Sequence, residues 1–318
     1  MKISLLEPIG VSADVIKELS QGIIDRGHEF VSYDTKTTDP KELVRRSAGS
    51  DIVMIANNPY PEEVVKSTDV LKMLSVAFTG IDHIATQACK DKDIMVCNAS
   101  GYSNETVAEL VIGMAVSAYR NLVLADSNVR GHKTSAGIGG MEICGKTVGI
   151  IGLGKIGKRT AELFLAFGAK VVAYNRSRDG EMEKKGVVYQ SLEEVLSGSD
   201  IISLNLPLNT STRGFLDSDR IAMMKKNAVF INCARGPIVD NQALADALNE
   251  ERLAYACIDV FDMEPPIPED YPLLHAKNTL LTPHIAFISK EAMLRRAKIV
   301  FENVYAYLDG QPQNVCKL

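Results

Sequence analysis

The sequence predicts an α/β protein of two domains, each built on a parallel sheet with helices on its faces. Short apolar runs alternate with segments of helical periodicity along almost the whole chain, which is the pattern of parallel sheets. The chain has 318 residues, enough for two separate cores. A glycine-rich turn near the middle lies between a strand and a helix, which indicates the start of a second sheet. The alternative is one large domain.

The first hundred residues contain five short apolar runs with helical segments between them. Ser12 is expected to cap the first of these helices. Five strands with interleaved helices predict a small parallel domain of the flavodoxin-like type. The predicted strands cover residues 3–6, 29–33, 51–55, 73–77 and 94–97.

Beyond residue 100 the alternation continues after one long helical segment. That segment starts near Ser103 or Asn104 and extends toward Arg130, and a glycine-rich loop follows over 131–140. Prolines 265, 266, 268 and 272 mark an extended loop, because proline disrupts a helix interior. After the glycine-rich turn, strands are predicted at 170–174, 200–204, 228–232, 254–260 and 279–282, and helices at 241–250 and about 289–308.

The glycine-rich turn follows an apolar strand and opens a helix, in the pattern G-x-G-x-x-G. Glycine is needed there because the backbone must turn tightly, approach a pyrophosphate and let helix and strand pack closely. The free N–H groups and the positive end of the helix then bind the phosphates. The pattern predicts a Rossmann unit that binds a dinucleotide, and a purely structural turn is the alternative. The residues are Gly152, Gly154, Lys155, Ile156 and Gly157.

The end of the next strand bears on the choice of dinucleotide. An NAD site places an acidic side chain there to bind the adenosine ribose. This chain has Asn175, Arg176, Ser177 and Arg178 instead. Since arginine pairs with a 2′-phosphate and a carboxylate repels it, the segment favours NADP over NAD. In the alternative, both arginines are solvated and NAD binds through Asn175.

Composition excludes several classes of protein. Apolar residues make up 46% and charged residues 24%, which is typical of a globular chain. A net charge of −5 without a basic run argues against nucleic acid as a partner. No apolar run is long enough to span a bilayer, and the N-terminus reads as a strand rather than a signal peptide. The six scattered cysteines predict reduced thiols in a cytoplasmic protein, with no disulfide frame and no metal site.

Over essentially its whole length the chain resembles the D-isomer-specific 2-hydroxyacid dehydrogenases. The resemblance implies that the final helix crosses back to the first domain. The substrate (catalytic) domain is then discontinuous, covering residues 1–99 and 286–318, and residues 100–285 form the Rossmann NAD(P)-binding domain. Besides the glycine-rich turn, the matching stretches are 79–84, 98–102, 107–109, 206–208, 232–240, 259–265 and 282–286.

The resemblance also implies a catalytic role for three side chains. Arg235 follows a strand end, and its planar guanidinium suits bidentate binding of a substrate carboxylate. His284 is the expected proton donor and acceptor, because imidazole titrates near neutrality. Glu264 is expected to orient His284 and favour its protonated form. The structural alternatives are a surface ion pair, a buried structural histidine and a capping glutamate.

The implied reaction is hydride transfer from NAD(P)H to C2 of a 2-oxo acid, which gives a D-2-hydroxy acid. Further contacts carry over from the resemblance, with ordinary packing as the alternative at each position. The expected cofactor contacts are Thr106, Leu206, Pro207, Thr212, Cys233, Ala234 and Asp259. The expected substrate contacts are Asn57, Phe78, Thr79, Gly80 and Phe287.

Two clues to the substrate point in different directions. The segment 57–60 has no cation, which disfavours a phosphorylated substrate, and 286–288 resembles D-lactate and D-2-hydroxyisocaproate dehydrogenases, with an apolar pocket. The segment 175–178 instead resembles NADP-dependent glyoxylate and hydroxypyruvate reductases.

Corepressor-like scaffolds that sense dinucleotides share these motifs, but they are expected to carry long tails. Members of the family commonly form homodimers through the cofactor domain, and the long helix after Ser103 is a candidate for that interface. The alternative is a core helix within one chain.

Overall fold

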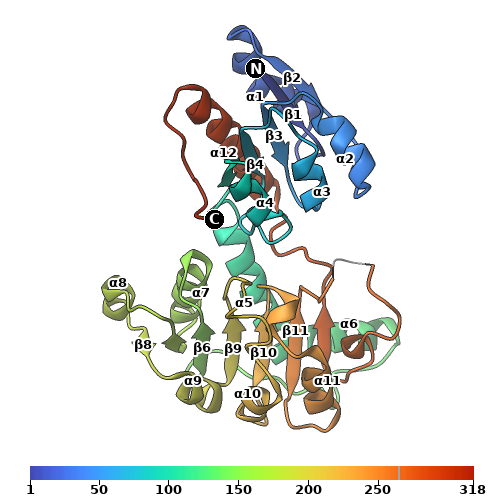
Figure 1. The fold of residues 1–318 in the computed structure, drawn as a ribbon. Coiled ribbons are helices and arrows are strands. Elements are labelled where there is room, and N and C mark those ends of the chain that lie inside the picture. Colours follow the sequence, from blue (N-terminus) through green and yellow to red (C-terminus); the bar gives the residue numbers. More distant parts are fainter. Residues whose placement is uncertain (264–265) are drawn as a thin grey trace. The chain divides into compact units, whose positions relative to one another are not determined.

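The computed structural model of the protein describes residues 1–263 and 266–318. The chain divides into two compact units. Unit 1 comprises Met1–Ser103 and Ile288–Leu318, and unit 2 comprises Asn104–Phe287. The boundaries expected from the sequence, after residues 99 and 285, lie a few residues before these limits. Each unit holds one parallel sheet (Figure 1).

The sheet of unit 1 has the strand order β2-β1-β3-β4-β5, and all its strand pairs are parallel. This is the flavodoxin-like order expected from the sequence. The chain leaves β1 on one side for β2 and on the other side for β3, so the carboxyl ends of β1 and β3 flank the switch point where such sheets bind ligands. The strands are β1 (Lys2–Leu5), β2 (Glu29–Ser32), β3 (Ile52–Ile55), β4 (Met73–Val76) and β5 (Met95–Asn98).

Helix α12, which is distant in sequence, belongs to unit 1 and packs on its sheet. Ser75 Oγ on β4 donates to the Val300 carbonyl oxygen at 3.0 Å, and Tyr305 Oη donates to the Leu19 carbonyl on α1 at 2.7 Å. Asn98 N donates to the Asn314 carbonyl oxygen at 3.1 Å, so the last residues cover the free edge of β5. The helices are α1 (Ala13–Asp25), α2 (Pro40–Ser47), α3 (Glu62–Lys66), α4 (Thr86–Asp91) and α12 (Lys290–Leu308).

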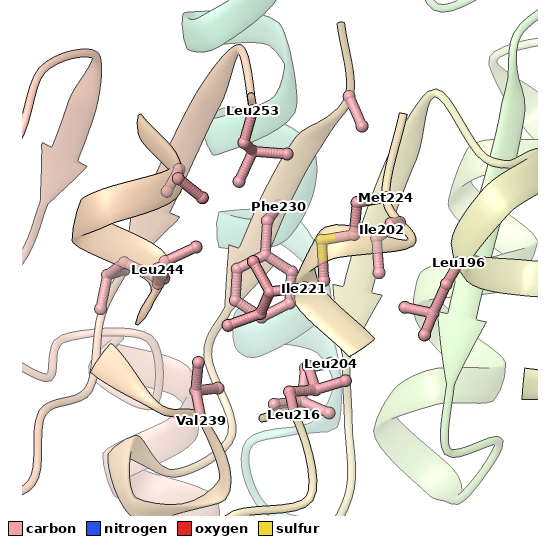
Figure 2. Close-up of a cluster of buried hydrophobic side chains, with 14 of the residues drawn as sticks. Leu196, Ile202, Leu204, Leu216, Ile221, Met224, Phe230, Val239, Leu244 and Leu253 are labelled. Atoms are coloured by element: carbon pink, nitrogen blue, oxygen red, sulfur yellow. The ribbon is translucent and has the colours of Figure 1, made fainter. Parts of the chain in front are cut away.

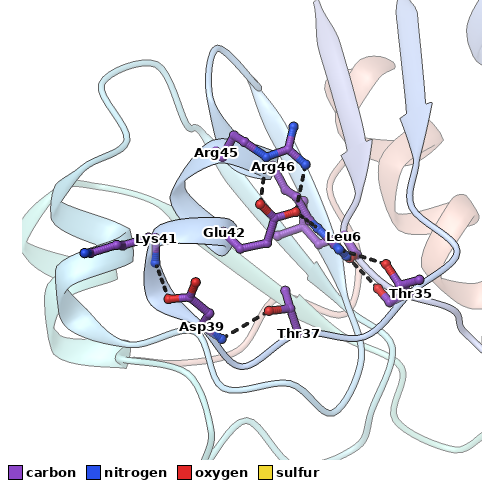
Figure 3. A network of polar contacts seen from close by, with 8 residues as sticks. All are labelled: Leu6, Thr35, Thr37, Asp39, Lys41, Glu42, Arg45 and Arg46. Carbon is purple, nitrogen blue, oxygen red and sulfur yellow. Dashed lines mark hydrogen bonds and ion pairs between the residues drawn. The ribbon is translucent and has the colours of Figure 1, made fainter.

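A buried arginine fixes the chain where it leaves β1 (Figure 3). Arg46 Nη1 donates to the carbonyl oxygens of Leu6 and Thr35 at 2.8 and 2.6 Å. Its Nε donates to Glu42 at 2.8 Å. Hydrogen bonds from Arg45 and Arg46 lower the pKa of Glu42 to about 2, so this anchor keeps its charge throughout the neutral range.

The sheet of unit 2 has the order β12-β11-β10-β9-β6-β7-β8, again fully parallel. The chain turns to β7 on one side of β6 and to β9 on the other, which is the Rossmann arrangement. The strands are β6 (Thr147–Ile151), β7 (Lys170–Tyr174), β8 (Val188–Tyr189), β9 (Ile201–Leu204), β10 (Val229–Asn232), β11 (Tyr255–Ile258) and β12 (Thr279–Leu281).

Among the described residues of unit 2, two apolar clusters contribute to the core. One contains β6, α5 and α7 side chains such as Ile150, Met114 and Phe164. Figure 2 shows the other, with the fully buried Phe230 of β10 near its centre. The helices are α5 (Asn104–Arg120), α6 (Leu122–Arg130), α7 (Lys155–Ala166), α8 (Gly180–Lys184), α9 (Leu192–Gly198), α10 (Ser218–Ala222) and α11 (Asn241–Asn249), with 3-10 turns at Gly236–Ile238 and Pro272–Leu274.

The single long helix predicted from Ser103 to Arg130 is wrong, because the segment forms two helices. Asn121 has φ +50°, a left-handed conformation, and α5 and α6 meet there at a 59° bend. No residue of α6 is buried. No single helix in the described chain has the length and apolar content to cross a membrane; α5 and α6 meet that criterion only together, as a bent pair, and eight of the 17 residues of α5 are buried.

Candidate active site

In unit 2, most of the residues predicted to be functional lie at one edge of the sheet. Parallel strands direct their carboxyl ends to the same edge, so loops that are far apart in sequence converge there. These segments are 152–157 after β6, 175–178 after β7, 205–212 after β9, 233–236 after β10, Asp259 after β11 and 282–284 after β12.

The loop after β6 has the shape of a phosphate cradle. Gly152 has φ +94°, and a Cβ on Gly157 would lie 2.1 Å from the Gly152 carbonyl oxygen. A Cβ on Gly154 would meet no described atom within 4 Å, so the space beside it is open. Gly154 is the N-cap of α7 and supplies no side-chain cap, which leaves the N–H groups of Lys155 and Ile156 without a side-chain acceptor there. This geometry fits the pyrophosphate of a dinucleotide.

The loop after β7 is fastened to the cradle by Asn175. Its Oδ1 accepts from Leu153 N at 3.1 Å, and its Nδ2 donates to the Ser177 carbonyl oxygen at 2.8 Å. Arg176 and Arg178 are exposed, and Arg178 Nη1 lies 3.6 Å from Glu183 Oε1. The side chain of Asn175 therefore has a structural task in this loop, and the two guanidinium groups face solvent.

The loop after β9 is braced by Thr212. Its Oγ1 donates to the Pro207 carbonyl oxygen at 2.6 Å and accepts from Asn209 N at 2.8 Å. Leu206 packs against the core cluster of Figure 2. In the described chain, then, Thr212 and Leu206 shape the loop that exposes Pro207.

The loop after β10 positions Arg235. Asn232 is fully buried; its Oδ1 accepts from Ala234 N at 3.0 Å and its Nδ2 donates to the Arg235 carbonyl oxygen at 3.1 Å. Arg235 Nη1 donates to the Ala234 carbonyl oxygen at 2.8 Å. Burial raises the pKa of the Cys233 thiol well above its usual value, so this cysteine is a packing residue rather than a nucleophile.

Gly236 lets the Arg235 loop lie directly against the chain that follows β11. A Cβ at this position would lie 2.0 Å from the Phe261 carbonyl carbon and oxygen, which excludes any larger residue. Asn241 Nδ2 donates to Asp262 Oδ1 at 2.9 Å, and Tyr271 Oη donates to Asp262 Oδ2 at 3.0 Å. These contacts hold residues 261–262, which precede Glu264; Glu264 itself lies outside the described residues.

Asp259 organises the loop that carries His284. Asp259 is fully buried, and its Oδ1 accepts from Thr282 Oγ1 at 2.6 Å and from Ile285 N at 2.9 Å. Its Oδ2 accepts from Ala286 N at 2.9 Å. Burial raises the pKa of this carboxyl group, and the three donors oppose that shift. The buried side chain thus holds both flanks of His284.

His284 has a left-handed backbone, with φ +54°. Such a conformation is strained for most non-glycine residues. Its N–H donates to the Asp259 carbonyl oxygen at 2.8 Å, and its ring meets Phe287 edge to face at 5.2 Å between centroids. Asp259 therefore holds the backbone of His284, and Phe287 packs against its imidazole, at the sheet edge where Arg235 lies. Thr106, the remaining predicted cofactor contact, is half-buried in the first turn of α5.

Unit 1 places its predicted residues at the carboxyl edge of its own sheet. Asn57 follows β3, while Phe78, Thr79 and Gly80 follow β4. Asn98 Nδ2 donates to the Thr79 carbonyl oxygen at 2.8 Å, which fixes the loop after β4. Phe78 is buried, and Thr79 and Gly80 are half-buried.

A comparison with protein families matches residues 112–286, over half of the chain, to the NAD-binding domain of D-isomer specific 2-hydroxyacid dehydrogenases. The chain belongs to the D-isomer-specific 2-hydroxyacid dehydrogenases. The resemblance noted in the sequence is thereby confirmed, together with the fold class it implied. As a member of this family, the protein is an NAD(P)-dependent oxidoreductase.

Individual relatives of this dehydrogenase cover nearly its whole length. A hydroxypyruvate reductase of Blautia hydrogenotrophica is 34% identical over 295 residues, covering 90% of this chain and 91% of that protein. A glyoxylate reductase of Aeropyrum pernix is 39% identical over 255 residues, covering 77% and 76%. The structure of an acyclic imino acid reductase in complex with NADPH and D-Arg is similar with a TM-score of 0.89 and 31% identity, over 100% of both chains.

The sequence did not indicate the polar residues, both buried and exposed, that support this dehydrogenase's loops. Asn232, Asn241 and Asp262 are the clearest examples, since each bonds a segment next to a predicted functional residue. Asn232 and Asn241 stood within a quoted motif or beside it, at the end of a strand and the start of a helix. A polar residue at the end of an otherwise apolar strand is the signal that identifies such supports.

Proposed function

We propose that the protein reduces an unphosphorylated 2-oxo acid to the D-2-hydroxy acid, with Arg235, Glu264 and His284 as its catalytic residues. A bound nicotinamide supplies the hydride to C2 of the 2-oxo acid. The observation that carries the proposal is the placement of Arg235, Asp259 and His284 at the ends of the adjacent strands β10, β11 and β12. They share that sheet edge with the glycine cradle.

Each proposed catalytic residue has a task suited to its chemistry. Arg235 binds the carboxylate through its planar guanidinium and polarises the neighbouring carbonyl. His284, protonated, donates a proton to the oxygen on C2 as that carbon is reduced. Glu264 orients the imidazole and favours its charged form. Asn57, Phe78, Thr79 and Gly80 of unit 1 contact the substrate.

The substrate in this proposal has a small side chain, as glyoxylate and hydroxypyruvate do. The segment 57–60 reads Asn-Asn-Pro-Tyr, with no cation for a phosphate. Two relatives are named as hydroxypyruvate and glyoxylate reductases, which supports a substrate with a small side chain.

The test is a panel of 2-oxo acids assayed by nicotinamide absorbance with NADH and with NADPH. Glyoxylate, hydroxypyruvate, pyruvate and a branched-chain 2-oxo acid cover the range of side chains. Turnover near or above ~1 s⁻¹ with a small substrate is expected of an enzyme. Slow turnover with every substrate contradicts the proposal and favours a dinucleotide-sensing scaffold. Turnover that appears only after an amine is added reassigns the substrate to an imine, because one similar structure is an imino acid reductase.

We propose NADP as the preferred cofactor, bound by Arg176 and Arg178 at the 2′-phosphate. Both side chains are exposed, whereas both polar ends of Asn175 are hydrogen bonded within the protein. Replacing both arginines by alanine should raise the KM for NADPH by about 10-fold or more and leave the KM for NADH nearly unchanged. Lys184→Ala removes another exposed cation from the adjoining helix and serves as the control. Equal changes for both cofactors would refute the assignment.

We propose that the protein is a homodimer in which a second copy covers α6. This helix presents Leu122, Val123, Leu124 and Val129 to solvent, and Val129 is 73% exposed. Exposed apolar residues clustered on one helix favour association. Val123→Asp with Val129→Asp should give a monomer by light scattering. Val188→Asp, at an exposed apolar residue on β8, should leave the mass unchanged. A monomeric parent protein, or a double variant that keeps its mass, would exclude this interface.

A further inference from the structure

Glu7 lies just beyond β1, at the switch point of the unit 1 sheet, and has no exposed surface. Its Oε1 accepts from Ala56 N at 2.8 Å and from Asn58 N at 2.9 Å. These are two N–H groups of the segment that follows β3. A single carboxylate oxygen therefore fixes the backbone on both sides of Asn57.

The segment fixed by Glu7 is in turn bonded to the loop that follows β4. Tyr60 N donates to the His83 carbonyl oxygen at 2.9 Å, and Ala85 N donates to the Tyr60 carbonyl oxygen at 3.0 Å. Tyr60 is fully buried, and its Oη donates to Ser47 Oγ at 3.0 Å. The segments that follow β3 and β4 are thus one connected structure, with Glu7 at its β1 end.

The charge of Glu7 is not needed to satisfy the two N–H groups. One acceptor oxygen suffices for them, and Oε2 has no hydrogen bond partner among the described residues. Burial raises the pKa of this carboxyl group, while the N–H donors and then Lys36 and Arg296 act to lower it. A buried oxygen without a hydrogen bond partner destabilises a fold, so Oε2 contributes nothing favourable here. The useful property of Glu7 is therefore the length of its side chain, which lets Oε1 reach both N–H groups.

We propose that Glu7 is a positioning residue for the substrate: through its two hydrogen bonds it sets the place of Asn57. This inference rests on the proposed function, in which Asn57 contacts the 2-oxo acid. Glu7 acts through the 56–58 backbone and touches neither substrate nor cofactor. Its influence should therefore appear in the KM for the 2-oxo acid rather than in kcat or in cofactor binding.

Two matched pairs of residues separate the reach of the side chain from its charge. Glu7→Asp keeps the carboxylate but shortens the side chain by one methylene, whereas Glu7→Gln keeps the length and one acceptor oxygen without the charge. Glu7→Asn is the short, neutral counterpart of Glu7→Gln. Each short variant should raise the KM for hydroxypyruvate by about 10-fold over its long partner, because two charge-assisted or amide hydrogen bonds are lost. The kcat and the KM for NADPH should stay within about twofold.

The outcomes distinguish this inference from the proposed function itself. Absence of turnover in the parent protein defeats the proposed function, whereas an active parent with equal KM values in long and short variants defeats the inference. If Glu7→Gln raises the KM for hydroxypyruvate as much as Glu7→Asp does, the inference is also defeated, because loss of charge alone would then raise the KM. If Glu7→Asp melts below the assay temperature, the Gln and Asn pair gives the same comparison without a buried charge.

A double-mutant cycle identifies Asn57 as the residue through which Glu7 acts. In an Asn57→Ala background, the step from Gln to Asn at position 7 should change the KM for hydroxypyruvate less than twofold, since the positioned side chain is already absent. An undiminished step of about 10-fold would show that Glu7 acts elsewhere and would overturn the assignment to Asn57.

Discussion

Replacing His284 by asparagine should lower kcat for 2-oxo acid reduction by about 10³-fold, with little change in the KM for NADPH. The loss reflects the removal of the proton donor to the substrate oxygen. Asparagine is the informative substitute because residue 284 has φ +54°, a conformation that asparagine adopts more readily than most residues. The variant therefore tests chemistry with the loop backbone preserved.

The pH dependence supplies an independent check on His284. Reduction by the parent enzyme should slow as the pH rises, because the proposed reaction takes up a proton through His284. This decline should be absent in His284→Asn. His275→Asn, at an exposed histidine whose Nε2 lies 2.6 Å from the Glu269 carbonyl oxygen, should retain both the rate and the decline. A parent rate that is flat from about pH 5 to 10, with chemistry rate-limiting, would contradict the role.

Replacing Asp259 by asparagine should lower kcat by about 10²-fold, because small displacements of a catalytic group cost this much. In the structure both carboxylate oxygens accept hydrogen bonds from the loop around His284. Asparagine offers one oxygen and one NH₂ group, so a donor would face either the Ile285 or the Ala286 N–H. The loop must then shift, and His284 shifts with it.

A smaller change at the same site gives an effect on kcat with which that of Asp259→Asn can be compared. Thr282→Val removes one of the three donors to Asp259 and leaves both backbone N–H groups in place. It should lower stability by about 1 kcal/mol in a denaturant titration and change kcat less than Asp259→Asn. If Asp259 acts by contacting the nicotinamide, as the resemblance implied, Asp259→Asn will mainly raise the KM for NADPH. That result would contradict the positioning role.

The parts of the fold and site that could be predicted from the sequence are those that depend on local residue patterns. The strand 170–174 appears with the predicted bounds, because a short run rich in apolar and β-branched residues, such as Lys-Val-Val-Ala-Tyr between loops, favours a buried strand over other structures. The residues at strand ends gather at one edge because parallel strands leave no other choice. Ser12 caps α1 as expected, accepting from Val15 N at 3.5 Å.

What could not be predicted depends on contacts between segments distant in sequence. The helical pattern continues through Asn121, but side chains of α5 enter the core cluster whereas no residue of α6 is buried, and the chain bends between them. Glu7 and Asn232 lie in apolar surroundings, where a polar residue shows its purpose only once its partners are known. The link between Asp259 and the His284 loop spans more than twenty residues of sequence.

The crowding between Gly152 and Gly157 has an evolutionary consequence. No larger side chain fits at residue 157, so the turn proposed to receive the pyrophosphate cannot change at that position. The neighbouring segment 176–178 is exposed, and Arg178 is 72% accessible. Mutations can accumulate there without disturbing the core. Substitutions of Arg176 and Arg178 should therefore change the proposed cofactor preference with little effect on thermal stability.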